Sequence, residues 1–214
     1  MKRKIKIAVI GGTGKSGKYL VKQLIKQGFQ LKILLRNPDN FQIKNALVEV
    51  VKGDVINYSS VSTLIEGCQA VISTLGLGIP ASEPTIFSQA TTNVIQVMNE
   101  LNVHRYIVTT GLNVDSPLDK KSSKTLFATD WMRKNYPIST TNKQSEFDIL
   151  SNSNVDWTLV RLPLIEQTDE SGEIIVSLED CPGDKVSATD LANFLIEQLS
   201  TDKFVRKSPF IASV

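Results

Sequence analysis

Short apolar runs alternate with segments of helical spacing along most of the chain. The first run, residues 5–10, is predicted to be a strand buried on both faces, because its apolar side chains stand close together and turn residues follow. Further strands are predicted at 31–35, 48–51, 70–74, 105–109 and 157–160, and helices at 15–27, 58–66 and 84–101. This alternation predicts an α/β fold with a doubly wound, mainly parallel sheet and helices on both faces.

The pattern is less regular after residue 111. Helical spacing is predicted over 126–134 and again over 143–150, with Pro137 interrupting it, and a helix after the N-cap sequence 187–190. Residues 173–178 and 210–212 are predicted as late strands. Since no repeat or linker divides the chain, we expect one domain over residues 1–214, with a small elaboration on the substrate side at about 163–186.

A glycine motif, G-x-x-G-x-x-G, stands between the first strand and the first helix. Gly11 can make the tight turn, Gly14 lets backbone approach a pyrophosphate, and Gly17 lets the helix sit close to the strand. The phosphates would rest on free N–H groups at the positive end of the helix, with the charge of Lys15 nearby. The motif predicts a dinucleotide site in a Rossmann fold.

Two other interpretations of this stretch are open. Gly14-Lys15-Ser16 resembles the end of a Walker A loop, but that motif needs a glycine five residues before Gly14, where this chain has Val9. A glycine-rich turn without a ligand is the simpler alternative. The position between a buried strand and a helix, at the start of an alternating chain, favours dinucleotide binding.

Composition excludes several classes of function. The formal net charge is +2 over 214 residues, too small to indicate nucleic acid or an acidic membrane surface as partner. The run Met1–Lys4 is basic, but no signal-peptide core follows it, and no span of 18 apolar residues occurs. With Cys68 and Cys181 as the only cysteines and His104 as the only histidine, we expect reduced thiols, no metal site and a cytoplasmic location.

Ligands bind such sheets at the carboxyl ends of the strands, so the loops there carry the candidate site. After the second strand, Arg36 stands where NAD-preferring proteins offer a carboxylate to the ribose, and its guanidinium can pair with the 2′-phosphate of NADP. The alternative is a surface arginine. After the third strand, Asp54 can accept from the adenine amino group while Val55 packs on the ring, although Asp54 can equally cap a turn.

The later strand ends add small residues and hydroxyl groups. Thr110 can place its hydroxyl near a nicotinamide, although threonines are also common in strands for packing reasons. The other residues that we expect along the cofactor at these ends are Thr74, Leu75, Gly76, Thr109 and Pro163.

These motifs resemble those of a known family. The stretches 11–17, 34–37, 53–55 and 160–163 together are similar to the atypical short-chain dehydrogenases/reductases of the NAD(P)H-binding, NmrA-like kind, and most to the flavin reductase/biliverdin-IXβ reductase group. The likeness covers nearly the whole chain and implies an NADP-binding Rossmann domain with an open shelf for flavins or similar flat molecules. It implies cofactor contacts at Gly11, Thr13, Gly14, Lys15, Ser16, Arg36, Asp54, Val55 and Thr110.

Two departures from related enzymes bear on the chemistry. The main branch of short-chain dehydrogenases uses Tyr-x-x-x-Lys, and none of the four tyrosines of this chain has lysine four residues later. Gly111 stands where the flavin reductase group has a serine. Thr110 and Lys143 are the candidate catalytic proton donors, although a solvated helix lysine is the simpler interpretation of Lys143.

Flavin reduction is compatible with the missing dyad, because ring stacking and positioning dominate that reaction. We therefore expect an NADPH-dependent oxidoreductase acting on flavin or a similar planar conjugated acceptor, as a monomer or weak homodimer. An NADP(H)-binding redox sensor of the NmrA type, without turnover, is the alternative. A sugar-nucleotide epimerase fits less well, because it needs the Tyr-x-x-x-Lys pair and a larger C-terminal domain.

Overall fold

The computed structural model describes residues 5–78 and 82–213. Within these residues the central sheet has eight strands, which are, from edge to edge, β3 (Val48–Lys52), β2 (Gln30–Leu35), β1 (Lys6–Ile10), β4 (Ala70–Ser73), β5 (Arg105–Gly111), β6 (Asp156–Leu162), β10 (Phe210–Ser213) and β8 (Ile174–Ser177). All neighbours are parallel except β8, which is antiparallel to β10. The predicted doubly wound, mainly parallel sheet is confirmed. The basic run 1–4 and residues 79–81 and 214 lie outside the described residues.

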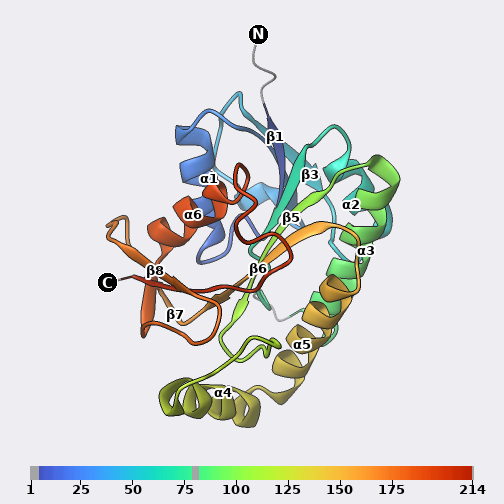
Figure 1. Cartoon of the computed structure of the whole chain (residues 1–214). Coiled ribbons are helices and arrows are strands. Elements are labelled where there is room, and N and C mark those ends of the chain that lie inside the picture. The colour runs from blue at the N-terminus through green and yellow to red at the C-terminus, as the bar shows by residue number, and fades with distance from the viewer. Residues whose placement is uncertain (1–4, 79–81, 214) are drawn as a thin grey trace.

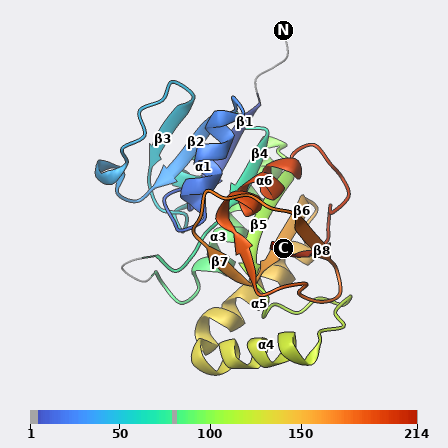
Figure 2. The same ribbon diagram turned by 90° about the vertical axis from the view of Figure 1, so that its left-hand side faces the viewer.

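Helices cover both faces of the sheet. One face carries α1 (Gly17–Lys26) and α6 (Ala188–Glu197), and the other carries α2 (Tyr58–Ile65), α3 (Ile86–Leu101) and α5 (Pro137–Ser151). Figures 1 and 2 show these two layers, and they show α4 (Ser123–Asn135) packed on α5 beyond the ends of the strands. The short η1 (Pro38–Asn40) follows β2.

Strand β1 joins the two hydrophobic cores. Ala8 and Ile10 belong to the core under α2, α3 and α5, while Ile7 and Val9 belong to the core under α1 and α6. All four side chains are buried, so the prediction of a strand buried on both faces is confirmed. Because β1 is packed on both faces, its carboxyl end, where the glycine motif begins, is held in place.

Several boundaries differ from the prediction. Helix α1 begins at Gly17 rather than residue 15, because residues 11–16 form the bend. Pro137 does not interrupt a helix but begins α5, where its missing N–H costs nothing and its fixed φ suits the first turn. Strand β5 continues through Gly111, where the sequence predicts a break. The N-cap prediction is confirmed, since the hydroxyl of Ser187 accepts from the N–H groups of Thr189 and Asp190.

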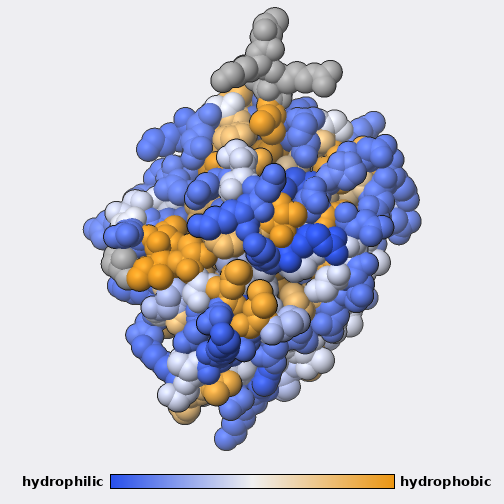
Figure 3. All heavy atoms as spheres, in the orientation of Figure 1, coloured by the Kyte–Doolittle hydropathy of each residue, from blue (hydrophilic) through white to orange (hydrophobic). Residues whose placement is uncertain are grey.

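The last third of the chain builds strands that the sequence predicts only in part. The late strands β8 and β10 are confirmed, but β7 (Leu164–Glu166) and β9 (Lys185–Ser187), which pair in parallel, were not predicted. A hydrophobic patch lies over the edge strand β8 in Figure 3, where Ile175 is exposed. No helix among the described residues is long and apolar enough to cross a membrane.

Candidate active site

The bend between β1 and α1 requires glycine at two positions. Gly11 has φ +76°, and a Cβ there would lie 2.6 Å from the carbonyl oxygen of Thr74. A Cβ at Gly17 would lie 2.0 Å from the carbonyl oxygen of Gly11. The hydroxyl of Thr74 donates to the carbonyls of Ile10 and Gly11, at 3.3 Å each. The bend is therefore held against the end of β4 and against its own helix.

The start of α1 presents the positive end of its helix dipole to the bend, where an anion is favoured. The N–H of Gly14 donates to the carbonyl of Gly11 at 2.9 Å, and the N–H groups of Lys18 and Tyr19 donate to the carbonyls of Gly14 and Ser16 at 3.2 and 3.1 Å. A Cβ at Gly14 would meet only the carbonyl of Gly11, at 3.2 Å, and the side chain of the N-cap Ser16 makes no capping bond. Gly11 and Gly14 line the cavity, as expected for glycines that approach a ligand. Gly17 does not line it, and its role is to let α1 pack closely against the bend.

A cavity of about 2000 Å³ opens at the carboxyl ends of the strands. Its wall contains every residue that the sequence places along a cofactor except Gly17: Gly11, Thr13, Gly14, Lys15, Ser16, Arg36, Asp54, Val55, Thr74, Leu75, Gly76, Thr109, Thr110 and Pro163. A site for one small ligand usually has about 300–1,000 Å³. This cavity therefore has room for a dinucleotide and a second molecule side by side.

Arg36 and Asp54 stand at one end of the cavity. Arg36 is exposed and donates from Nη1 to the hydroxyl of Ser82 at 3.2 Å, so it is both a surface arginine and part of the wall. Asp54 accepts from the N–H of Ile56 at 3.2 Å, which confirms the turn-capping contact. Asp54 also lines the cavity, as does the buried Val55.

Thr109 and Thr110 differ in their surroundings. The hydroxyl of Thr109 donates to the carbonyl of Ser73 at 3.4 Å. The hydroxyl of Thr110 is buried and has no hydrogen-bond partner among the described residues. A buried hydroxyl without a partner is costly, and this one belongs to the cavity wall.

The position of Asn113, just after β5, explains why residue 111 is a glycine. A Cβ there would lie 2.4 Å from the Oδ1 of Asn113, whose side chain is buried. The Asn113 amide thus occupies the space that a serine side chain would need at position 111. This contact is invisible in the sequence, because it depends on how the chain folds back after the strand.

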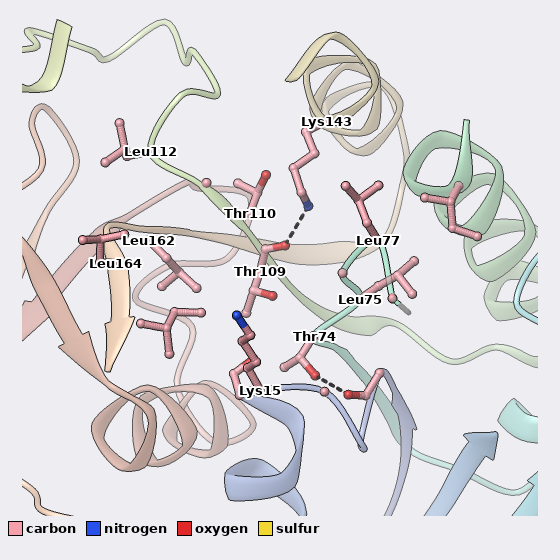
Figure 4. Close-up of a pocket in the computed structure, with 18 of the residues that line it drawn as sticks. Lys15, Thr74, Leu75, Leu77, Thr109, Thr110, Leu112, Lys143, Leu162 and Leu164 are labelled. Carbon is pink, nitrogen blue, oxygen red and sulfur yellow. Dashed lines mark hydrogen bonds between the residues drawn. The ribbon is translucent and has the colours of Figure 1, made fainter. Parts of the chain in front are cut away.

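Lys143 is not a solvated helix lysine, so the simpler interpretation is wrong. Its side chain is only 16% exposed, and its Nζ lies 3.6 Å from the Oε2 of Glu146 and 3.8 Å from the centre of the Phe87 ring. Nζ also lies 3.5 Å from the carbonyl of Thr109, and Figure 4 shows Lys143 and Lys15 reaching toward Thr109 from opposite sides. Burial lowers the pKa of Lys143, while the neighbouring Glu146 acts in the opposite direction.

Helix α4 and the residue after it supply an aromatic wall that the sequence did not predict. Phe127, Trp131 and Tyr136 all line the cavity and are all more than half exposed. The rings of Trp131 and Tyr136 meet edge to face, with centroids 5.8 Å apart. Aromatic residues within a polar helix are the signal that could have found this wall, since nothing in the helix needs them for a core.

Comparison with known proteins identifies the family. The sequence model of the NAD(P)H-binding family matches residues 11–202. The chain belongs to the NAD(P)H-binding family. An isoflavone reductase homolog A622-like protein from Nicotiana tabacum is 32% identical over 136 residues, which are 58% of this chain and 41% of that protein. The chain thus matches about two fifths of that relative's length.

Solved structures share the fold of this NAD(P)H-binding protein. A short-chain dehydrogenase/reductase from Veillonella parvula, in complex with NADP, has a TM-score of 0.83 and 15% identity, covering 98% of this chain and 94% of that chain. A proposed NADH-flavin reductase from Streptococcus pneumoniae has a TM-score of 0.78 and 20% identity, covering 98% and 100%. The fold expected from the resemblance is confirmed.

The residues at the glycine bend fit the cofactor of the NAD(P)H-binding family. Side chains at Gly11 and Gly17 would break the bend, and Gly14 lines the cavity with no side chain between its backbone and a ligand. The unpartnered hydroxyl of Thr110 offers a polar contact further along the same cavity. The chain can therefore hold a dinucleotide from the bend to the end of β5.

Proposed function

We propose that the protein is an NADPH-dependent reductase that transfers hydride to a flavin or a similar planar conjugated acceptor. One observation carries this proposal: a single cavity joins the glycine bend to the aromatic wall of α4, and the largely buried side chain of Lys143 also lines it. A cofactor site alone would not need the second half of this cavity. The relatives that are reductases support the same class of chemistry.

Different residues of the chain bind different parts of the cofactor. The bend and the start of α1 receive the diphosphate, Arg36 pairs with the 2′-phosphate, and Asp54 accepts from the adenine amino group. Leu75, Gly76 and Pro163 line the path toward the nicotinamide end. Bound NADPH supplies the hydride. The chain fixes the distance between the two rings, because positioning is its main contribution to this reaction.

The acceptor end combines flat side chains with a proton donor. Phe127, Trp131 and Tyr136 present ring faces and edges against which a planar molecule can stack. Lys143, whose Nζ lies 3.5 Å from the Thr109 carbonyl in the cavity wall, would supply a proton to the acceptor. Thr110 is the second candidate donor, and its buried hydroxyl fits better as a contact that orients the bound ring.

Steady-state turnover tests the proposal directly. The purified protein is mixed with NADPH and, separately, FMN, riboflavin and a quinone, and the nicotinamide absorbance band is followed. We expect oxidation of NADPH that saturates with the acceptor concentration. The absence of turnover with all three acceptors, in a protein shown by calorimetry to bind NADPH, would contradict the reductase proposal.

One observation favours the alternative of an NADP(H) sensor without turnover. The Asn113 amide fills the place of the serine side chain expected at position 111, so the cavity lacks that hydroxyl. A sensor would bind NADP and NADPH with different affinities and would show no turnover with any acceptor. Calorimetry with both forms of the cofactor, beside the turnover assay, separates the two functions.

A further inference from the structure

Glu146 is a buried carboxylate that the proposed reaction does not use. Its side chain is 1% exposed and lies three residues after Lys143 on α5, so both side chains share one face of the helix. The hydroxyl of Thr91, on α3, donates to Oε1 at 3.0 Å. Oε2 has no hydrogen-bond partner among the described residues and faces the Lys143 ammonium at 3.6 Å.

The surroundings of Lys143 contain one negative charge in contact with it. Helix α3 presents the Phe87 ring and the Thr91 hydroxyl, and β5 presents the Thr109 carbonyl. Tyr106 of β5 is titratable, but complete burial raises its pKa so far that it stays neutral. The remaining titratable or charged side chains of this cavity are Lys15, Arg36, Asp54, Lys124, Tyr136, Cys181 and Asp184. Within the described residues, Glu146 is therefore the negatively charged side chain that contacts Lys143 and serves as its counter-ion.

Removing one partner of such a pair affects the other strongly. A buried charge without its partner is far less stable than the pair, and a lysine can respond by losing its proton. The Phe87 ring attracts an ammonium through its face but supplies no full charge. Lys143 therefore depends on Glu146 both for its charge and for the direction of its amine.

We propose that Glu146 is the positioning residue that keeps Lys143 protonated and directed at the acceptor end of the cavity. Its catalytic meaning rests on the proposed reductase function, in which hydride and a proton reach the acceptor together. The Lys143 ammonium gives up that proton, becomes a neutral amine and regains a proton from solvent through the open mouth of the cavity. Glu146 does not line the cavity, so it acts through Lys143 and touches neither cofactor nor acceptor.

The sign of the expected effect follows from the two opposing influences on Lys143. Burial lowers the pKa of the amine, and the Glu146 carboxylate limits that fall. Replacing the carboxylate with a neutral amide removes the limit, so the pKa of Lys143 falls further. A fall of one unit means ten times less ammonium at any pH well above the pKa.

A titration of Lys143 that needs no turnover tests the pairing. Lysines are acetylated with acetic anhydride over a range of pH, and mass spectrometry of the peptides gives an apparent pKa for each amine in wild type and in Glu146→Gln. We expect the apparent pKa of Lys143 to fall by one unit or more, while the exposed Lys134 is acetylated to the same extent in both proteins. An unchanged Lys143 titration in the folded variant would overturn the proposal.

Two further variants make the result specific. Glu197→Gln removes the same charge from an exposed position on α6, and it should leave the titration of Lys143 unchanged. Thr91→Val keeps the carboxylate but removes its hydrogen bond, which raises the pKa of Glu146 beyond the rise due to burial. It should shift Lys143 in the same direction as Glu146→Gln by a smaller amount. If Glu146→Gln does not fold, the absence of any shift in Thr91→Val overturns the proposal.

The pH dependence of kcat separates this proposal from the proposed function. In Glu146→Gln the basic limb of the profile should move to lower pH by the shift measured for Lys143, with KM for NADPH unchanged. A chemical titration that shifts in a protein without turnover would contradict the reductase function and support the pairing. A normal profile with an unshifted titration would support the reductase function and overturn the role of Glu146.

Discussion

The bend between β1 and α1 depends on the absence of side chains at particular residues. Gly17 lies so close to the Gly11 carbonyl that a Cβ would overlap it at 2.0 Å, and neither atom belongs to a flexible side chain. The contact joins the end of the strand to the first turn of the helix. Binding at the bend and stability of the fold are therefore coupled at this one position.

We expect Gly17→Ala to destabilise the protein and to abolish cofactor binding. Overpacking of a tight contact costs about 1–3 kcal/mol, and a clash with backbone belongs at the upper end of this range. Chemical denaturation and calorimetry with NADPH measure the two effects. Gly76→Ala is the matched control, because a Cβ there meets nothing within 4 Å, and its free energy of unfolding should stay near wild type.

Arg36 should select the phosphorylated cofactor. Its guanidinium lines the cavity and, within the described residues, hydrogen-bonds only to the Ser82 hydroxyl, so it can turn to a 2′-phosphate. A hydrogen bond to a charged group contributes about 1.5–3 kcal/mol. We expect Arg36→Ala to weaken NADP binding by roughly 10- to 100-fold and to change NAD binding little. Equal losses for both cofactors would remove Arg36 from the phosphate site.

At the scale of the elements, the placement of α4 depends on a buried arginine of β6. Arg161 is fully buried, and its guanidinium donates to the Asp119 carboxylate at 2.6 Å. It also stacks on the Phe210 ring and donates to three carbonyl groups, those of Val114, Ser208 and Leu178. These contacts fasten the segment between β5 and α4 to three strands. Arg161 is thus one of the side chains that tie the segment before the aromatic wall to the sheet.

We expect Asp119→Asn to lower stability strongly. The substitution leaves the Arg161 charge buried without its counter-ion, and breaking a buried pair in this way costs about 3–5 kcal/mol. Thermal and urea denaturation give the change. Asp130→Asn on α4 removes an exposed partner of Arg133 at 3.8 Å and should cost about 0–1 kcal/mol. Similar losses for both variants would contradict a special role for the buried pair.

The elements could be predicted well wherever local pattern decides them. The strands and helices of the first 111 residues follow apolar spacing and glycine turns, and their positions agree within a few residues. The arrangement around Lys143 could not be predicted, because the burial of its side chain depends on how α5 docks on α3 and β5. The burial of Arg161 could not be predicted either. It lies near the end of β6, but segments distant in sequence enclose its side chain.

At the scale of the whole molecule, the site is assembled from loops along the full length of the sheet. The cavity wall extends from Ile10 at the end of β1 to Asp184 before β9, so a ligand that fills it contacts most of the chain's connections. Sequence motifs found the cavity-lining residues at the glycine bend and at the strand ends, because each of those residues follows a strand. They did not find the aromatic residues of α4, because that helix packs on α5 beyond the ends of the strands.

We expect NADPH to stabilise the whole domain. A ligand that binds only the folded state adds about 2.7 kcal/mol at a concentration 100 times Kd, which for a chain of this size raises Tm by roughly 5–10 °C. Differential scanning calorimetry measures the shift. Gly17→Ala should show no such gain, and a wild-type Tm that is indifferent to NADPH at millimolar concentration would contradict cofactor binding.

The contact between position 111 and Asn113 makes these two residues interdependent over evolutionary time. A hydroxymethyl group cannot enter at 111 until the amide at 113 has turned aside or been replaced by a smaller side chain. Either change alone is penalised, one by a clash and the other by an empty space beside β5. A serine at position 111 is therefore accommodated either by rotation of the Asn113 side chain or together with a smaller residue at position 113, so a change at one position alters which residues the other accepts.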